Sequence, residues 1–415
     1  MKKQKPKKNK AKKDGIYLDY ASATPISKNV LAAMSEFSGV FANPGGIHAK
    51  SVEAKKLIAE ARKRIAKAID ARPEEIVFTA SATESNMLAL QGSVNAWKKM
   101  FPSEVPHAII SAIEHPSVME TAKMLEDSGV LVSRISVDEH GVINLPELKN
   151  AIQQNTVIVS VMQANNEIGT IEPIDAITKT LRHYKKEISK NERAPEYPLF
   201  HVDATQAFQY MPIRVIKPEV DFMTISSGKI YGPRGIALLF ARNNSPLDSV
   251  LHGGGQEDGR RGGTEATMLI VGFAQAIEET VAMRAKETAR LEKILEAGKK
   301  ELAKRIPDAK LLGHPTKRLP NNLCFSIAGI ESDYLVLALS AKKIYASSRS
   351  ACSADKVSGN ELDSHVILST GGNPTDGTVR LSFGRDTKTT DIQQAIKVTA
   401  EAVSQWRMWS HAHKK

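Results

Sequence analysis

The sequence predicts an α/β fold in which a large domain with a mainly parallel sheet is joined to a smaller α/β domain. Short apolar runs alternate with helical or turn-rich stretches along most of the 415 residues. This alternation is typical of a parallel sheet covered by helices on both faces. From about Glu278 the pattern changes to one long amphipathic segment rich in Glu, Lys and Ala, which predicts a helix connecting the two domains.

The individual elements follow from this periodicity. A first helix is expected over residues 51–70, because the apolar residues there recur on one helical face. A strand at 75–79 and a turn leading into a helix near Ser81 come next. The later strand candidates are residues 107–111, 156–162, 198–203, 221–226 and 235–240. All of them are short and apolar, as strands buried on both faces are.

Most of the net charge of +11 belongs to a basic tail. Residues 1–14 carry eight Lys and one Asp, a net of +7, which leaves +4 for the rest of the chain. The tail lacks aromatic residues and apolar periodicity, so we expect it to be disordered. We expect no nucleic-acid binding by the folded part. Contact with RNA or anionic lipid through the tail alone is the alternative to a purely solubilising role.

Cysteine and hydropathy patterns exclude several classes of protein. Two cysteines cannot form a disulfide framework, which favours a reducing, cytoplasmic compartment. They also exclude a multi-cysteine metal site made by this chain, and no metal is expected. No apolar run approaches the roughly 18–20 residues of a membrane span. No apolar stretch follows the lysines, so the tail lacks the pattern of a signal peptide.

Polar residues with chemical potential follow the expected strands, where open α/β sheets gather their active sites. These residues are Ser81-Ala82-Thr83, His115, Asn165-Asn166, Asp203 and Lys229. Taken singly, each also fits a structural role, such as a helix cap. Together they meet the needs of pyridoxal 5′-phosphate (PLP). Its aldehyde requires a lysine, its pyridine nitrogen a carboxylate, and its phosphate backbone amides and hydroxyls.

With these motifs the chain resembles the cysteine desulfurases of the class V aminotransferase group, in particular the long-loop branch that serves iron–sulfur cluster assembly. The matching stretches are IYLDYASATP (16–25), FANPGGIHAKS (41–51), VFTASATESNMLAL (77–90), EHPSV (114–118), NNEIGTI (165–171), HVDATQ (201–206), SSGKIYGPRG (226–235), HGGGQEDGRRGGT (252–264), SSRSACSA (347–354) and RLSFGR (380–385). The resemblance implies the PLP-dependent, aspartate-aminotransferase-like fold. It implies a large PLP-binding domain at 27–281 and a small domain made of 15–26 and 282–415. The basic tail at 1–14 is an addition to this core.

The resemblance also implies roles for the residues that would hold the cofactor ring. Lys229 would form the Schiff base, and Asp203 would pair with the pyridinium nitrogen. Gln206 would bind the ring hydroxyl. His115 would stack on the ring and relay a proton.

Further residues would bind the phosphate of the cofactor. The backbone amides near Ala82, with the hydroxyls of Thr83 and Ser226, would hold it within one subunit. Thr264 would reach the phosphate of the neighbouring subunit. That role implies a homodimer with shared active sites.

The implied reaction uses Cys352 as the sulfur acceptor. Asn166, which would also bind the cofactor, and Arg380 would bind the carboxylate of L-cysteine. The planar guanidinium of arginine is matched to a carboxylate. Cys352 would receive the substrate sulfur as a persulfide, release alanine, and pass the sulfur to an acceptor or iron–sulfur scaffold protein. Arg349 and Lys356 flank this thiol, and we expect them to lower its pKa.

Four positions depart from the family pattern. Gly228 stands where the family usually has the histidine that donates to the phosphate. Arg349 and Ser353 replace the glycine and threonine beside the catalytic cysteine, and Gln256 replaces a histidine. None of these removes a group that PLP chemistry requires. Cofactor retention, rate and acceptor choice are the properties they would affect.

Two other functions are compatible with the sequence. A selenocysteine lyase or another class V aminotransferase would keep PLP and change the chemistry; the aminotransferase would need no loop thiol. A catalytically inactive sulfur carrier or nucleic-acid-associated protein belongs to a different class. The presence of Lys229, Asp203 and Cys352 argues against it. The second cysteine, Cys324, lies in an apolar strand-like run and is expected to be buried.

Overall fold

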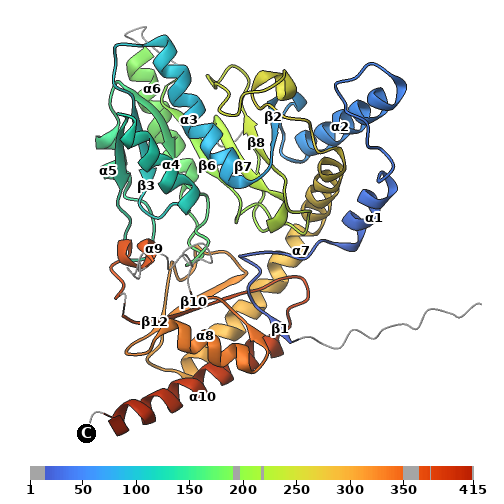
Figure 1. Cartoon of the computed structure of the whole chain (residues 1–415). Helices are drawn as coiled ribbons and strands as arrows, with labels where there is room; N and C mark the ends of the chain where they lie inside the picture. The colour runs from blue at the N-terminus through green and yellow to red at the C-terminus, as the bar shows by residue number, and fades with distance from the viewer. Residues whose placement is uncertain (1–14, 190–196, 216–218, 349–363, 374, 414–415) are drawn as a thin grey trace, which may run out of the picture.

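The computed structural model describes residues 15–189, 197–215, 219–348, 364–373 and 375–413 (Figure 1). Its α-helices are α1 (Lys28–Glu36), α2 (Ala49–Ala68), α3 (Ala82–Met100), α4 (Pro116–Asp127), α5 (Leu145–Ala151), α6 (Ile174–Ser189), α7 (Thr267–Arg305), α8 (Ser332–Ala341), α9 (His365–Ser369) and α10 (Thr389–His413). Its strands are β1 (Ile16–Tyr17), β2 (Ile76–Thr79), β3 (His107–Ser111), β4 (Leu131–Ile135), β5 (Thr156–Ser160), β6 (Leu199–Asp203), β7 (Phe222–Ser226), β8 (Ala237–Ala241), β9 (Lys310–Leu311), β10 (Asn322–Ile327), β11 (Ile344–Tyr345) and β12 (Gly377–Ser382). Within these ranges no helix is both long and apolar enough to cross a membrane.

A seven-stranded sheet with the order β2-β8-β7-β6-β5-β3-β4 forms the centre of the larger part. Only β8 runs antiparallel to its neighbours; the other described pairs in this sheet are parallel. The predicted, mainly parallel sheet is therefore confirmed. The edge strand β4 was not expected, because Ser133 and Arg134 interrupt its apolar run.

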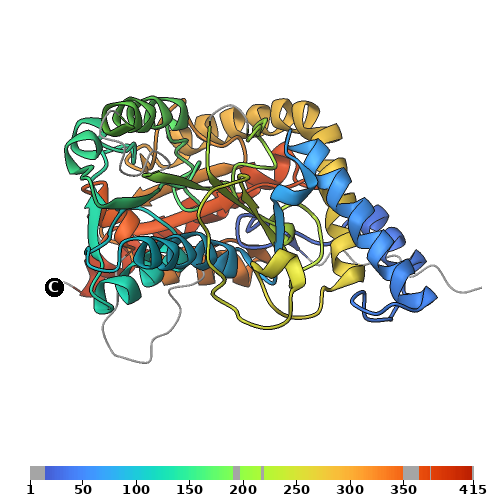
Figure 2. The ribbon, with the colours of Figure 1, turned by 90° about the horizontal axis from the view of Figure 1, so that it is seen from above.

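Helices cover both faces of this sheet, as Figures 1 and 2 show. Successive side chains of a strand point to opposite faces of the sheet, and in β3 they enter different hydrophobic clusters. In β3, Ala108 and Ile110 pack with residues of α3 and α4, including Trp97. Ile109 instead packs in the cluster that contains residues of α2, α6 and α7. Burial on both sides accounts for the continuous apolar runs of the sequence.

The long helix α7 connects the two parts of the molecule. It begins at Thr267, earlier than the expected start near Glu278, because the apolar residues before that glutamate are helical as well. Ile270 and Phe273 in this first portion are fully buried. Along its length α7 contacts α1 and α2 near the large sheet and α10 in the smaller part.

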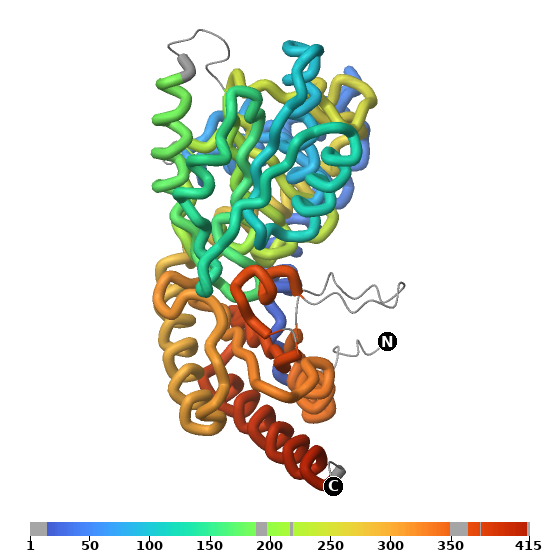
Figure 3. The backbone as a smooth tube through the Cα atoms, turned by 90° about the vertical axis from the view of Figure 1, so that its left-hand side faces the viewer, coloured from blue at the N-terminus to red at the C-terminus, as the bar shows by residue number. Residues whose placement is uncertain are grey.

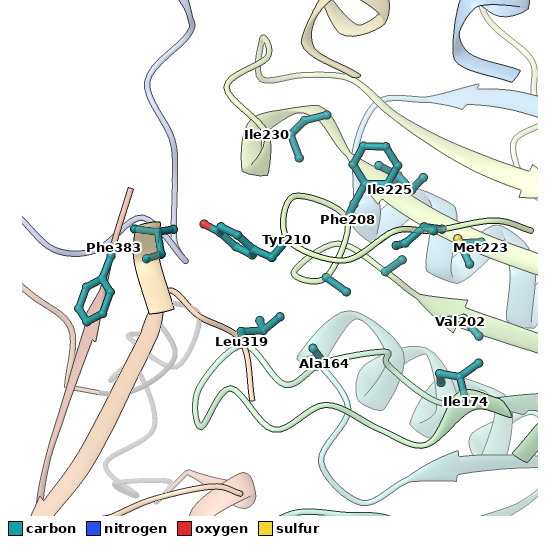
Figure 4. Packing of buried hydrophobic residues seen from close by; sticks show 14 of the residues in the cluster. Ala164, Ile174, Val202, Phe208, Tyr210, Met223, Ile225, Ile230, Leu319 and Phe383 are labelled. Atoms are coloured by element: carbon teal, nitrogen blue, oxygen red, sulfur yellow. The ribbon is translucent and has the colours of Figure 1, made fainter. Parts of the chain in front are cut away.

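The smaller part contains an antiparallel sheet of order β12-β10-β9 with α8 and α10 packed beside it (Figure 3). The N-terminal strand β1 pairs in parallel with β11 in this part. One hydrophobic cluster runs from the large sheet into the smaller part. Figure 4 shows Tyr210 and Leu319 between Phe208 on one side and Phe383 on the other. The two parts therefore share a continuous core next to the site described below.

Truncating a buried residue of α7 tests how much this helix contributes to stability. Leu291 is 0% exposed, and we expect Leu291→Ala to lower the free energy of unfolding by about 2–5 kcal/mol, as core truncations do. Met283, on the same helix, is 39% exposed, and Met283→Ala should stay within about 0.5 kcal/mol of the parent protein. Urea unfolding followed by circular dichroism measures both. Equal losses for the two variants would contradict the assigned packing of α7.

Candidate active site

A cavity of about 280 Å³ lies at the carboxyl ends of the central strands. The segments after β2, β3, β5, β6 and β7 all reach it, as expected for ligand sites of parallel sheets. Segments from both ends of the chain complete its wall. The lining residues are Ala21, Ser22, Ser81, Ala82, Thr83, His115, Met162, Ala164, Asn166, Asp203, Thr205, Gln206, Ser226, Lys229 and Arg380.

The N-terminus of α3 forms one end of the cavity. Ser81 is its N-cap and accepts a hydrogen bond from the Glu84 N–H at 3.2 Å. The Glu84 carboxylate accepts from the Ala80 N–H at 2.8 Å and pairs with Arg261 at 2.6 Å. These bonds fix the turn from β2 into α3. The first-turn amides at Ala82 and Thr83 thus border the cavity, where a helix N-terminus favours an anion such as phosphate.

Asp203 ends β6 and is only 5% exposed. A buried carboxylate is costly unless hydrogen bonds satisfy it. Its Oδ2 accepts from Asn86 Nδ2 at 2.8 Å, and its Oδ1 accepts from the Thr205 N–H at 2.9 Å. Both oxygens are thus held, and the plane of the carboxylate is fixed.

His115 is the N-cap of α4. Its Nδ1 accepts a hydrogen bond from the Ser117 N–H at 3.1 Å and lies 2.9 Å from Ser117 Oγ. Burial lowers the pKa of His115, and the charges of Lys229 and His365 act in the same direction, whereas Asp203 opposes them. The imidazole is therefore neutral at pH 7 and serves as an acceptor at Nδ1.

The N-terminal segment closes the cavity over Lys229. Lys229 Nζ donates to the carbonyl oxygens of Ala21 at 2.8 Å and Ser22 at 2.6 Å. Gln206 Nε2 donates to the same Ala21 oxygen at 2.9 Å. The carbonyl of Gly228, directly before the lysine, accepts from Thr24 Oγ1 at 3.0 Å. Residues before α1 therefore set the position of the lysine and of its turn.

Arg380 enters the cavity from β12 and is 2% exposed. Its Nη2 donates to Asp19 Oδ1 at 2.7 Å and to Ser22 Oγ at 2.9 Å, and its Nη1 donates to the Asn166 carbonyl at 3.0 Å. Its buried Nε has no partner in the part of the chain that the structure describes. The guanidinium is thus held in place with donor capacity left over, which suits it for binding a carboxylate.

The chain on either side of residues 349–363 is attached next to this cavity. Ser347 pairs with Arg380 through two backbone hydrogen bonds of 3.3 and 2.8 Å. On the other side, Ser364 Oγ donates to Glu167 Oε2 at 2.6 Å, and His365 Nε2 donates to the Glu114 carbonyl at 2.8 Å. The N-terminal flank therefore contacts Arg380 itself. The C-terminal flank contacts Glu167 and Glu114, the residues next to Asn166 and His115.

The residues around the cavity fit PLP. The cavity brings together a lysine amine, a fixed carboxylate and a helix N-terminus, which are the three groups that this cofactor needs. In addition, Thr205 Oγ1 is buried and has no partner within the described ranges. A hydroxyl of this kind on a cavity wall is available to a ligand.

Nine of the residues proposed from the sequence line this one cavity. They are Ala82, Thr83, His115, Asn166, Asp203, Gln206, Ser226, Lys229 and Arg380. Thr264 is exposed and is not among the lining residues. Cys352, Arg349, Ser353 and Lys356 lie outside the described residues. The individual roles stay predictions.

Several residues that line the cavity had no role predicted from the sequence. Ser22 and Ala21 come from the stretch 16–25, which was quoted as a match but given no role. Met162, Ala164 and Thr205 come within four residues of the end of β5 or β6. Position relative to a strand end would have indicated these three, although their side chains carry no distinctive chemistry.

A buried acid lies behind the segment that carries Asn166. Glu172 Oε2 accepts from the Ile143 N–H at 3.0 Å, and its buried Oε1 has no partner among the described residues. Burial raises the pKa of Glu172 from 4.5 to about 8. The carboxyl group is therefore largely protonated at pH 7 in the folded protein.

Comparison with known proteins gives consistent results over nearly the whole chain. The family described as Aminotransferase class-V matches residues 16–395. A protein named cysteine desulfurase IscS from Dictyoglomus turgidum is 36% identical over 397 residues, which cover 94% of this chain and 95% of the relative. Cysteine desulfurase IscS 1 from Archaeoglobus fulgidus is 37% identical, covering 96% of this chain and all of the relative.

Solved structures show the same architecture. A NifS-like protein superposes with a TM-score of 0.84 at 31% identity, covering 94% of this chain and 99% of the other. A structure described as SspA in complex with cysteine gives a TM-score of 0.73 at 33% identity, covering 89% of this chain and 98% of the other. The α/β fold predicted from the sequence is therefore shared with these proteins.

Glu172→Gln tests the protonation of the buried acid. A carboxyl whose pKa is raised on folding contributes stability below pH 4.5 and loses that contribution as the pH rises to about 8. Since Gln does not titrate, the unfolding free energy of Glu172→Gln relative to the parent should increase over this window, by at most about 5 kcal/mol. Urea unfolding between pH 5 and 9 measures the difference. A difference that does not change with pH would rule out a raised pKa.

Proposed function

The chain belongs to the class V aminotransferase family and is a cysteine desulfurase, and we propose that it converts L-cysteine into L-alanine with PLP as cofactor. The observation that carries the proposal is the single cavity lined by Lys229, Asp203 and the N-terminus of α3. We propose iron–sulfur cluster assembly as the process that receives the sulfur, because the chain resembles the long-loop branch of the cysteine desulfurases. Release of alanine from L-cysteine by the PLP-supplemented protein is the direct test.

The residues that would hold PLP divide into three groups. Lys229 would bind its aldehyde carbon. Asp203 would hold the proton on its pyridine nitrogen, and Gln206 would bind its ring hydroxyl. The amides near Ala82, with the hydroxyls of Thr83 and Ser226, would bind its phosphate. When bound, PLP supplies an electron sink that stabilises negative charge developing on the substrate.

Substrate binding is assigned to Arg380 and Asn166. The substrate carboxylate needs a buried cation, and Arg380 offers a guanidinium already held by Asp19 and Ser22. Asn166 is adjacent, because its carbonyl accepts from Arg380 Nη1. The relative solved with cysteine supports an amino acid of this size as the substrate. His115, neutral and beside Asp203 and Lys229, would stack on the ring and exchange a proton during the reaction.

Cys352 is assigned as the nucleophile that takes the sulfur. Its thiolate attacks the sulfur of the substrate, the bond between that sulfur and Cβ breaks, and the carbon skeleton gains a proton to leave as alanine. The sum is L-cysteine plus the Cys352 thiol giving L-alanine plus the Cys352 persulfide. Contacts of Ser347, Ser364 and His365 beside the cavity support this assignment, since they flank the segment that carries Cys352.

We further propose a homodimer in the cytoplasm that hands its sulfur to an acceptor or iron–sulfur scaffold protein. Phe41 and Ile47, between α1 and α2, are 91% and 98% exposed, and exposed apolar side chains commonly mark interfaces. In such a dimer Thr264 would reach the partner's cofactor phosphate. The two-cysteine composition supports a reducing compartment.

The division into domains is also proposed. We place a large PLP-binding domain at 27–281 and a small domain at 15–26 and 282–415. Pairing of β1 with β11 supports assigning the N-terminal segment to the small domain. The boundary at 281 falls within α7, so a single helix would belong to both units.

Cys352→Ser tests the sulfur-transfer step. We expect the variant to bind PLP normally and to lose sulfide release from L-cysteine with dithiothreitol, because a hydroxyl cannot accept the sulfur. Cys324→Ala is the matched control: Cys324 is 1% exposed, and burial raises its pKa to about 12. Its activity should be retained. Sulfide release by Cys352→Ser at the parent rate would exclude the desulfurase mechanism and favour a class V activity without a loop thiol.

Gly228→His tests the departure next to Lys229. A Cβ built at Gly228 would meet only Arg234 Cγ, at an ordinary contact distance of 3.5 Å. We therefore expect Gly228→His to fold and, by adding a donor near the phosphate, to bind PLP about tenfold more tightly. Absorbance titration of the apoprotein measures the dissociation constant. Gly228→Leu supplies similar bulk without a donor; an equal gain in that variant would show that hydrogen bonding is not the cause.

A further inference from the structure

A continuous chain of hydrogen bonds joins Asp203 to His115 through two buried residues that have no proposed role above. Asn86 Nδ2 lies 2.8 Å from Asp203 Oδ2 and 2.9 Å from Ser117 Oγ. Ser117 Oγ in turn lies 2.9 Å from His115 Nδ1. Asn86 is 0% and Ser117 8% exposed. The two residues belong to α3 and α4, the helices whose N-termini open onto the cavity.

The donors and acceptors in this series of hydrogen bonds can be assigned from the chemistry of the groups. An ionised carboxylate only accepts hydrogen bonds, so Asn86 must turn its NH2 group toward Asp203. The second hydrogen of the same NH2 group goes to Ser117 Oγ. Asn86 Oδ1 is buried without a partner among the described residues. The hydrogen bond to the Asp203 carboxylate therefore orients the side-chain amide of Asn86, although this leaves Asn86 Oδ1 without a donor among the described residues.

These assignments then fix the tautomer of the imidazole. The Ser117 N–H donates to His115 Nδ1, so this nitrogen carries a lone pair and accepts. Ser117 Oγ accepts from Asn86, and its own hydrogen therefore goes to the same Nδ1. Two donors that converge on Nδ1 require a lone pair there, so the ring proton of the neutral imidazole resides on Nε2.

We propose that Asn86 and Ser117 are positioning residues that hold His115 as its neutral Nε2–H tautomer for as long as Asp203 is ionised. The proposal deepens the proposed function, since it rests on the roles given there to Asp203 and His115. Its consequence is that the charge of Asp203, acting through Asn86 and the Ser117 hydroxyl, favours the same protonated nitrogen of His115, Nε2, that the Ser117 N–H favours. The link needs no direct contact between Asp203 and His115.

The other charged groups around His115 do not supply this link. Lys229 and His365 face the imidazole from the turn after β7 and from α9, and both disfavour its protonation. Glu114 precedes it, is buried, and has a pKa raised well above the usual range mainly by burial. Its Oε1 accepts from the Met162 N–H, away from the chain of bonds described here. The path through Asn86 and Ser117 does reach Nδ1, through hydrogen bonds of 2.8, 2.9 and 2.9 Å.

The tautomer is measurable by NMR of the full-length protein labelled with ¹⁵N-histidine, with and without PLP. We expect long-range ¹H–¹⁵N spectra to show the Nε2–H form of His115, assigned by its loss in His115→Gln. Ser117→Ala removes one donor to Nδ1 and should raise the pKa of His115 by roughly half a pH unit or more. Ser117→Thr, which keeps the hydroxyl, should restore the parent titration. Asn86→Leu should behave like Ser117→Ala.

Two outcomes would overturn the proposal. One is an Nδ1–H tautomer in the parent protein, and the other is an unchanged His115 titration in Ser117→Ala. Should Asn86→Leu fail to fold, the pair Ser117→Ala and Ser117→Thr decides alone. The spectra are recorded without substrate. If the protein released no alanine from cysteine yet showed the expected tautomer and titrations, the proposed function would fail and this inference would stand.

Discussion

The burial of one negative charge, that of Asp203, organises the site. A carboxylate that is 5% exposed would be strongly unfavourable without donors. The Asn86 amide and the Thr205 N–H meet this requirement at 2.8 and 2.9 Å. Asn86 in turn links α3 to Ser117 in α4. A single electrostatic requirement at the end of β6 thereby fixes how two helices present their N-termini to the cavity.

The opposite wall depends on a second buried charge. Arg380 is held by Asp19, and breaking a buried ion pair by removing one partner is strongly destabilising. The same N-terminal segment supplies the Ala21 and Ser22 carbonyl oxygens that hold Lys229. The guanidinium and the amine are thus both positioned by a few residues before α1. The parallel pairing of β1 with β11 anchors this segment in the smaller part.

Sequence patterns predicted the central strands well because burial on both faces leaves continuous apolar runs, as in β3, where the bounds agree. The patterns did not predict β4, because its partly exposed residues form no continuous apolar run. They also did not predict the start of α7, because the sequence of a buried apolar helix resembles that of a buried strand. Residues defined by ionisable chemistry, such as Asp203 and Lys229, could be proposed from their place after a strand. Asn86 could not, since its importance arises from a neighbour distant in sequence.

The pairing of the chain's beginning with its end has a consequence for biosynthesis. The Leu18 carbonyl accepts from the Ser382 N–H at 2.8 Å, and β1 lies along β11. The cavity wall at residues 19–22 therefore cannot assemble while the strands near residues 344–382 are still inside the ribosome. A ligand that needs the complete cavity can therefore bind only after the strands up to residue 382 have left the ribosome. Nascent fragments containing only the central sheet would expose the lysine turn without its cover.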